Sequence, residues 1–264
     1  MSAGAGRRGG HGAWRRYGPA LALVLAALGT WELAVRALHV PEYLLPAPSA
    51  VLQDVRADRR LLLDNSWVTL REVLGGFALA VTAGLLLALA LHLSGTLRRA
   101  IYPILIGSQT VPVVVLAPIL VILLGFDIAP KLAIVALICF FPIVVNGVDG
   151  LRSVDGDLVR MMRTLDASRW AILKRVELPS ALPLLFSGMR VAATYAAIGA
   201  VFGEWSGSSA GLGYLMLQAT PNLDTPRIFA AVAILTLLSL ALFLLVSLLE
   251  RLLVPWARAP AQQP

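Results

Sequence analysis

Six long apolar runs restrict what this chain can fold into more than any other feature of its sequence. They lie near Pro19–Leu38, Val73–Leu93, Ile101–Leu124, Lys131–Gly147, Ala181–Phe202 and Ile228–Leu249. An α-helix needs about 20 predominantly apolar residues to cross the hydrocarbon core of a bilayer, and the runs are close to that length. Their apolar residues are continuous and do not alternate, which excludes a closed transmembrane barrel. The sequence therefore predicts an all-α membrane protein with about six transmembrane helices.

The composition separates a membrane protein from a soluble protein with a large core. Hydrophobic residues make up 58% of the 264 residues and charged residues only 14%, whereas a soluble domain carries about 25% charged residues. The formal net charge is +7, a sign that is also common in nucleic-acid-binding proteins. Because the basic residues lie between the apolar runs, we attribute them to orientation in a lipid bilayer and expect no nucleic-acid partner.

The basic residues are shared unequally between alternate connections. With the N-terminus in the cytoplasm, the cytoplasmic segments hold roughly twice as many Arg and Lys residues as the external ones, as the positive-inside rule requires. Both termini are then expected in the cytoplasm. The predicted organisation is a basic tail at 1–17, a first transmembrane helix at 18–38, an external loop with an interfacial helix at 39–70, a core transmembrane domain at 71–255 with a cytoplasmic loop at 148–181, and a tail at 256–264.

The first apolar run admits two interpretations. Its basic start is typical of a signal peptide, but its apolar part continues to Leu38, which is longer than the apolar region of most such peptides. A retained transmembrane helix is therefore favoured. Glu32 and Arg36 lie four residues apart on one face of this helix, which predicts an ion pair between them.

The segment Thr164–Pro183, TLDASRWAILKRVELPSALP, predicts a short helix within the cytoplasmic loop. Asp166 is expected to cap the N-terminus of this helix by accepting hydrogen bonds from free backbone amides. Leu178-Pro179 is expected to end the helix, because the residue before a proline disfavours helical backbone. We expect Pro183 to open the next transmembrane span.

One face of this short helix is apolar, because Trp170, Leu173 and Val176 recur every three residues. Lys174 and Arg175 stand in its last turn, where positive charge suits the helix dipole. An apolar face of this kind packs on lipid head groups, on its own domain or on a partner protein, and the pattern leaves these three alternatives open.

Proline recurs within the apolar runs and predicts kinks in the corresponding helices. The prolines concerned are Pro103, Pro112, Pro118, Pro142 and Pro183. The third run and its approach hold the first three, which makes this helix the first candidate to line a transport path, with Gln109 and Pro112 as possible path residues. Ordinary kinks of membrane helices are the alternative interpretation.

Charged residues stand out in the fifth run. Glu204 lies beside Trp205 at its outer end, either as an interfacial residue next to an aromatic anchor or as a group near the outer mouth of a substrate path. Both residues are therefore further candidates for the path. Arg190 lies well inside the same run, where it either extends its side chain toward the interface or pairs with an acid.

The sequence lacks the motifs of several chemistries. No G-x-x-x-x-G-K-[ST] motif occurs, so the chain has no P-loop with which to bind ATP itself. The single cysteine, Cys139, and the scattered His11, His39 and His92 do not predict a metal cluster. Neither a carboxylate pair nor a Ser/His/Asp set stands out. We therefore expect no catalytic residue, no metal site and no cofactor in this chain.

The run DLVRMMRTLDASRWAILKRVELPSALPLLFSGMRVA resembles the cytoplasmic-loop motif of bacterial ABC importer permeases. Leu178-Pro179 and Gly188 match that motif, whereas Asp166 stands at its first glycine and RMM at 160–162 replaces its E-A-A triplet. The runs QTVPVVVLAPILVILLGF and GEWSGSSAGLGYLM are also similar to this family. The match looks closest to the branch for nitrate, sulfonates and taurine, and within it to permeases for hydroxymethylpyrimidine, a thiamine precursor.

This resemblance implies the type I ABC importer permease fold, in a multi-pass protein of the bacterial plasma (inner) membrane. A separate cytoplasmic ATPase would bind ATP and Mg and dock on the loop, where the implied contact residues are Arg163, Thr164, Leu165, Asp166, Ala167, Ser168, Arg169, Trp170, Leu178 and Pro179. An extracytoplasmic solute-binding protein would deliver the solute, and a second permease subunit, expected to be an identical one, would pair with this chain. The implied solute is hydroxymethylpyrimidine, with a sulfonate, taurine or nitrate as the alternative.

Two other classes of protein remain for comparison. An ion-coupled secondary transporter is expected to have inverted repeats and intramembrane acids, and a membrane-embedded enzyme needs a clustered catalytic set. The sequence shows neither clearly. An importer permease without its own ATPase is therefore the favoured interpretation.

Overall fold

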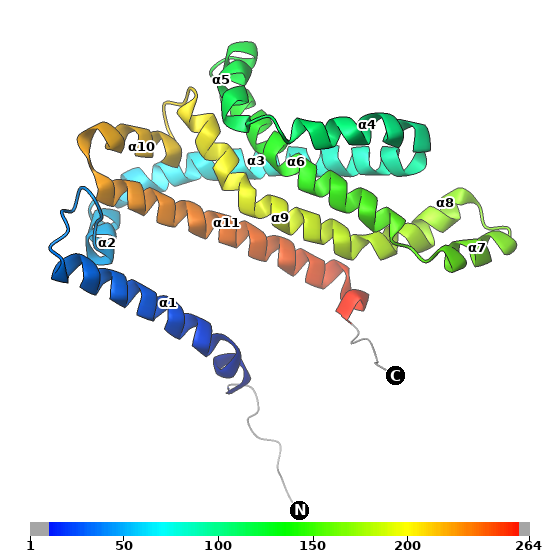
Figure 1. The fold of residues 1–264 in the computed structure, drawn as a ribbon, viewed down its shortest axis with the longest axis horizontal. Helices are drawn as coiled ribbons and strands as arrows, with labels where there is room; N and C mark the ends of the chain where they lie inside the picture. The colour runs from blue at the N-terminus through cyan, green and yellow to red at the C-terminus, as the bar shows by residue number, and fades with distance from the viewer. Residues whose placement is uncertain (1–10, 259–264) are drawn as a thin grey trace, which may run out of the picture. The chain divides into compact units, whose positions relative to one another are not determined.

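The computed structural model describes residues 11–258, and all regular elements in that range are helices (Figure 1). The chain divides into two compact units. The smaller unit comprises Met1–Arg59 and Ala219–Ala230, and the larger unit comprises Arg60–Gln218 and Ala231–Pro264. The prediction of an all-α protein is confirmed for the described residues.

The smaller unit contains α1 (His11–Ala37), α2 (Pro48–Ala57) and the first turns of α11. The predicted pair between Glu32 and Arg36 is present, with Arg36 Nε donating to Glu32 Oε1 over 2.6 Å. Glu32 also accepts hydrogen bonds from the hydroxyl and the backbone amide of Ser49, which fix the start of α2 against α1. The first span is therefore joined to the loop that follows it by a polar contact.

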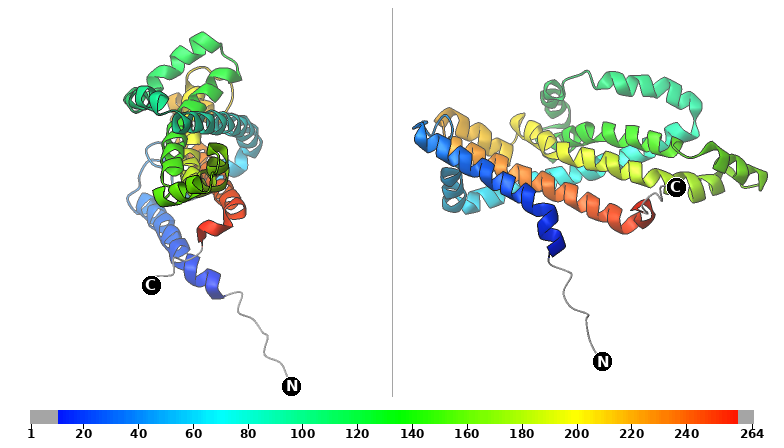
Figure 2. Two further views of the ribbon diagram at one scale, coloured as in Figure 1. Left: turned by 90° about the vertical axis from the view of Figure 1, so that its right-hand side faces the viewer. Right: turned by 60° about the horizontal axis from the view of Figure 1, so that its bottom comes forward.

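The larger unit is built on α3 (Arg59–Leu93), α6 (Ile128–Arg152), α9 (Leu178–Trp205) and most of α11 (Thr225–Leu253). Helices α6 and α9 run side by side (Figures 1 and 2) and form the most extensive helix pair of the unit. Their side chains dominate the core, in which Ile134, Val135, Cys139, Ala192 and Ala196 are 0% exposed. The fourth apolar run, Lys131–Gly147, belongs to a helix of 25 residues.

Small residues let α6 and α9 approach closely. A Cβ atom on Gly188 would lie 2.6 Å from the carbonyl oxygen of Pro142, and one on Gly199 would lie 2.8 Å from Cα of Val135. Glycines at such contacts allow the backbones of membrane helices to pack directly against each other. The glycine that the loop motif shares with its relatives, Gly188, is therefore explained by helix packing.

The third apolar run, Ile101–Leu124, is not one continuous helix, and the kink predicted from its prolines is a break between two helices. Helices α4 (Gly95–Ser108) and α5 (Val113–Leu124) meet at 103° (Figure 1). Pro112 is the N-cap of α5 with extended backbone, and a proline both lacks an amide donor and disfavours helical backbone in the residue before it. Among the described residues, 5 helices are long and apolar enough to span a bilayer, or up to 6 if the bent pair counts as one span.

The predicted boundary before the second span also needs correction. The short helix of the external segment is α2, and α3 begins at Arg59, well before Val73. Asn65 and Thr69, polar residues of this helical stretch, have hydrogen-bond partners inside the protein.

The larger unit has two polar ends. At the first, called the α10 end, the starts of α3 and α6 and the end of α9 meet α10 (Leu212–Ala219). At the second, called the loop end, the ends of α3 and α6 and the start of α9 meet α7 and α8. The remaining elements are α7 (Gly156–Thr164), α8 (Arg169–Ile172), a π-helical turn (Leu173–Glu177) and 3₁₀ turns at Thr220–Asn222 and Pro255–Arg258.

Candidate functional site

The loop that sequence analysis singled out forms the end of the larger unit between α6 and α9 (Figure 1). Helix α7 starts where the carboxylate of Asp155 accepts a hydrogen bond from the amide of Asp157. Helix α8 starts at Ser168, whose hydroxyl accepts a hydrogen bond from the amide of Ala171 over 3.3 Å. We call residues 156–179 the loop segment.

Asp166 does not cap α8, and the prediction that it does is wrong. It lies between α7 and α8 with φ of 55°, in the left-handed region. Its amide donates to the carbonyl of Arg163 and the amide of Ala167 donates to that of Met162, which is the hydrogen-bond pattern of a helix C-terminus closed by a left-handed residue. Glycine suits such a position best, and aspartate tolerates it better than most residues. The structure therefore accounts for a motif that usually has glycine here and for its replacement by aspartate.

Leu178-Pro179 does not end a helix, contrary to expectation. The backbone stays helical from Arg169 to Trp205, and only its hydrogen bonding changes at the π-helical turn. The amide of Leu178 bonds to the carbonyl of Leu173, five residues earlier. This wider turn accommodates a proline ring that would otherwise clash with a carbonyl of the preceding α-helical turn. Pro183 likewise lies inside α9 and does not open it.

The predicted apolar stripe is divided between two environments. Leu173 and Val176 are buried, and Leu173 packs with Leu151, Ala181 and Leu185 at the ends of α6 and α9. Trp170, in contrast, is 68% exposed. The stripe therefore anchors the loop segment to its own unit while its tryptophan remains outside.

The outer surface of the loop segment combines apolar and basic side chains. Leu165 is 71% exposed and Met161 is 52% exposed. Arg163 and Arg169 are exposed in the same stretch. We call these four residues together with Trp170 the exposed loop surface. The ten loop residues named from sequence thus fall into exposed ones, such as Thr164, Asp166, Ser168 and Leu178, and the half-buried Ala167 and Pro179.

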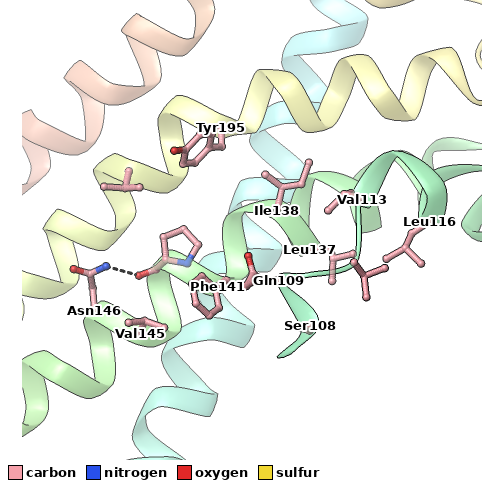
Figure 3. A pocket seen from close by; sticks show the side chains of 13 residues that line it. Ser108, Gln109, Val113, Leu116, Leu137, Ile138, Phe141, Val145, Asn146 and Tyr195 are labelled. Carbon is pink, nitrogen blue, oxygen red and sulfur yellow. Dashed lines mark hydrogen bonds between the residues drawn. The ribbon is translucent and has the colours of Figure 1, made fainter. Parts of the chain in front are cut away.

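A cavity of about 600 Å³ lies between the α4–α5 break, α6 and α9 (Figure 3). Gln109, predicted as a path residue, lines it together with Asn146 and Tyr195. The other lining residues are Ser108, Val111, Val113, Leu116, Leu137, Ile138, Phe141, Pro142, Val145 and Val191. Among these described residues none is Asp, Glu, Lys, Arg or His. The cavity is therefore apolar and aromatic with a few uncharged hydrogen-bonding groups.

The other predicted path residues lie elsewhere. Pro112 is in the same break as Gln109 but does not line the cavity, and its role is to start α5. Trp205 lines a second hollow of about 460 Å³, formed mainly by α9 and α11. Its indole Nε1 donates to the carbonyl of Gly213 over 2.9 Å.

Glu204 is 1% exposed and belongs to a buried network at the α10 end. Its carboxylate accepts hydrogen bonds from the hydroxyl of Thr69 over 2.6 Å, from the amide of Gly213 over 2.5 Å and from that of Tyr214 over 3.1 Å. A carboxylate at these amides caps the start of α10. The structure therefore places Glu204 inside the protein, neither at the lipid interface nor on the cavity lining.

Sequence analysis missed the buried polar residues around Glu204. Asn65 accepts a hydrogen bond from the amide of Gly211, and Lys131 lies 3.6 Å from the buried carboxylate of Glu72. Asn65, Thr69 and Glu72 are spaced four and three residues apart, which places them on one face of α3. This periodic polar face next to an apolar run was the available signal.

Arg190 pairs with Glu250, which decides between the two interpretations of this arginine. The pair joins α9 to α11, and the two side chains are 27% and 20% exposed. Pairing reduces the cost of placing a guanidinium within a transmembrane helix.

Comparison with known proteins agrees with this architecture. The sequence pattern of the family described as "Binding-protein-dependent transport system inner membrane component" matches residues 80–259. The formylaminopyrimidine transport permease protein ThiX of Halalkalibacterium halodurans is 38% identical over 229 residues, which cover 86% of this chain and 91% of that protein. The riboflavin transport system permease protein RibX of Chloroflexus aurantiacus is 39% identical over 243 residues, with 90% and 91% covered.

More distant matches agree in fold. The putative aliphatic sulfonates transport permease protein SsuC of Bacillus subtilis is 29% identical over 249 residues, covering 92% of this chain and 89% of that protein. The methionine ABC transporter MetNI, solved in an inward-facing conformation, superposes with a TM-score of 0.59 at 18% identity, covering 71% of this chain and 95% of that chain. The fold is thus the type I permease fold that the loop motif implied. The chain belongs to the family of binding-protein-dependent transport system inner membrane components, and it is a multi-pass ABC importer permease of the plasma membrane.

Proposed function

We propose that this permease imports a pyrimidine precursor of thiamine, such as hydroxymethylpyrimidine, and that a separate cytoplasmic ATPase drives it through the exposed loop surface. The ATPase would bind ATP and Mg, since the chain has no P-loop. A solute-binding protein would deliver the solute, and a second permease copy would complete the path. The loop segment and both termini would lie in the cytoplasm.

The observation that carries the substrate proposal is the uncharged lining of the cavity between α6 and α9. A sulfonate or nitrate ion leaving water for this lining would lose hydration without gaining a counter-charge, which is costly. A neutral heterocycle would stack against Phe141 or Tyr195 and exchange hydrogen bonds with Gln109 and Asn146. The relatives named for formylaminopyrimidine and riboflavin, at 38% and 39% identity, agree with a planar heterocyclic solute better than the sulfonate permease at 29%.

Transport in proteoliposomes that contain the permease, its ATPase and its solute-binding protein tests the substrate. We expect ATP-dependent uptake of hydroxymethylpyrimidine and none of taurine or nitrate. Asn146→Asp, which introduces charge into the cavity, should lower uptake about tenfold. Thr236→Val, on the second hollow, is the matched control and should transport normally. Uptake of taurine or nitrate in place of the pyrimidine would contradict the assignment.

The docking proposal is supported by the exposure of an aromatic side chain among basic ones. Tryptophan and arginine are the residues that most often dominate the energy of protein interfaces. Trp170 is 68% exposed although its helical neighbour Leu173 is buried. A surface of this kind fits a groove on a partner protein.

Co-purification of the ATPase with the permease tests the docking. Trp170→Ala should weaken ATPase association and abolish ATP-dependent uptake, while the permease keeps its thermal stability. Trp67→Ala is the control, because Trp67 is 58% exposed in the first part of α3, at the other end of the unit. Undiminished association of the Trp170 variant would show that docking does not use this surface.

A further inference from the structure

A basic hollow lies outside the loop segment and the two cavities described above. Arg98, Arg99, Tyr102 and Pro103 from α4 and Arg152 from the end of α6 line a space of about 240 Å³. We call these five residues the basic hollow. Two parts of the chain that are far apart in sequence thus bring three arginines to one concave site.

The arginines of the basic hollow have no acidic partner among the described residues. Other arginines of the described chain do form ion pairs, namely Arg36, Arg160, Arg190 and Arg227. Three like charges around one hollow repel one another, and a bound anion would reverse that effect. A phosphate group suits them best, because guanidinium groups bind phosphate oxygens in pairs.

The position of Arg98 and Arg99 strengthens the positive potential. They lie near the N-terminus of α4, a helix of 14 residues that starts after Ser94. The N-terminus of a helix carries partial positive charge and is favourable for anions. This field and the three guanidinium groups favour the same kind of ligand.

The basic hollow is held in shape by packing. Leu97, Ile101, Tyr102 and Leu105 of α4 pack against a buried cluster of Ala88, Leu91, Val144 and Val148 on α3 and α6. This contact fixes α4 against α6, so that Arg98 and Arg99 remain near Arg152. The site therefore needs little rearrangement to bind a ligand.

An apolar side chain follows the basic hollow along α4. Ile106 is 53% exposed and lies about two turns after Arg98 and Arg99, on the face of α4 that also carries Tyr102 and farther from the loop end. Arg152 is the last residue of α6, four positions before the loop segment begins. Positive charge thus lies at the end of the helix bundle, and apolar surface lies deeper in it. A phospholipid has the matching arrangement, because its phosphate lies at the membrane interface and its acyl chains lie below. A free phosphate ion would make no apolar contact with Ile106.

We propose that the basic hollow binds the phosphate of an anionic phospholipid in the leaflet next to the loop segment, with an acyl chain against Ile106. Basic pockets between transmembrane helices are known to bind such head groups. The hydroxyl of Tyr102 would donate a hydrogen bond to the same phosphate. The proposal does not depend on which solute the permease carries.

Native mass spectrometry of the purified full chain in detergent tests the proposal. Added phosphatidylglycerol or cardiolipin should bind, and zwitterionic phosphatidylcholine should bind much more weakly. The triple variant Arg98→Gln, Arg99→Gln, Arg152→Gln should weaken binding of the anionic lipid about tenfold or more. The triple variant with Lys at the same positions keeps the charge but not the paired hydrogen bonds, so it should bind more tightly than the Gln variant and less tightly than the unmodified chain, which separates charge from misfolding.

A matched control removes the same charge elsewhere. Arg56, Arg59 and Arg60 are exposed around the start of α3, and their triple Gln variant should bind the anionic lipid as the unmodified chain does. Equal loss in both Gln variants would overturn the proposal. Displacement of the lipid by millimolar inorganic phosphate would identify a free-anion site, and loss of ATPase association with unchanged lipid binding would identify a protein contact. Either result would also overturn it.

Discussion

The hydroxyl of Thr69 donates a hydrogen bond of 2.6 Å to the carboxylate of Glu204, although the two residues are 135 positions apart. The same hydroxyl oxygen accepts a hydrogen bond of 2.9 Å from the amide of Leu212. One buried side chain of α3 thus joins the end of α9 to the start of α10. This contact and the hydrogen bonds that Glu204 accepts from the amides of Gly213 and Tyr214 fix the backbone of the glycine-rich segment GEWSGSSAGLGYLM.

Thr69→Val should lower the stability of the permease by about 1–3 kcal/mol, because the change leaves a buried carboxylate oxygen and a buried amide without a partner. Thermal unfolding in detergent measures this loss. Thr82→Val is the matched control on the same helix, because the exposed hydroxyl of Thr82 bonds only to the carbonyl of Ala78. Equal midpoints for the two variants would contradict a stabilising role for the network.

Gly188→Ala should also destabilise the permease, by about 1–3 kcal/mol, because the added methyl group would force α6 and α9 apart. The new Cβ would meet the carbonyl oxygen of Pro142 at 2.6 Å and Cβ of Asn146 at 2.7 Å. Gly107→Ala in α4 is the control, since a Cβ there meets nothing within 4 Å. It should be neutral or slightly stabilising. A Gly188→Ala variant as stable as this control would disprove the close-packing explanation.

The long helices could be predicted from the sequence because bilayer thickness and continuous hydrophobicity act on whole segments. Because hydrophobicity is read over whole segments, it does not show where a helix breaks within one of them. The break at Gln109–Pro112 lies within an apolar run, and no hydropathy pattern separates a kinked helix from two helices at 103°. Pro112 was the one visible signal, and a proline is compatible with either outcome.

The polar contacts were predictable only where both partners are close in sequence. Glu32 and Arg36 could be paired by helical spacing, whereas the partner of Arg190 is 60 positions away at Glu250. In the loop segment, the sequence shows that Asp166 belongs to a helix terminus. Whether it caps the start of α8 or closes the end of α7 depends on its backbone angles, which the sequence does not show. Asp166 is well suited both to cap a helix start and to close a helix end, and only its φ of 55° decides between them.

Asp166→Gly should preserve coupling and stability, because glycine adopts the left-handed backbone of this position without strain. Asp166→Val should cost about 1–2 kcal/mol and misplace the loop segment, since a β-branched residue strongly disfavours positive φ. Limited proteolysis of the loop and ATP-dependent uptake report on the two effects. Arg160→Val, in the helical backbone of α7, controls for the valine side chain itself. If the Asp166→Val variant has a loop as resistant to proteolysis, and uptake as fast, as that control, the left-handed geometry is refuted.

The pair of Arg190 and Glu250 allows a test in which charge is separated from packing. Glu250→Gln should destabilise the permease by about 2 kcal/mol, because it leaves a partly buried guanidinium without its counter-ion. Replacing both residues by Met should cost less than the sum of the two single replacements, since no charge is then unpaired. Arg251→Gln, an exposed neighbour on α11, should leave the unfolding midpoint unchanged. Additive effects in this double-mutant cycle would mean that α9 and α11 are held by apolar packing alone, and that Arg190 is tolerated in its helix by extending toward the interface.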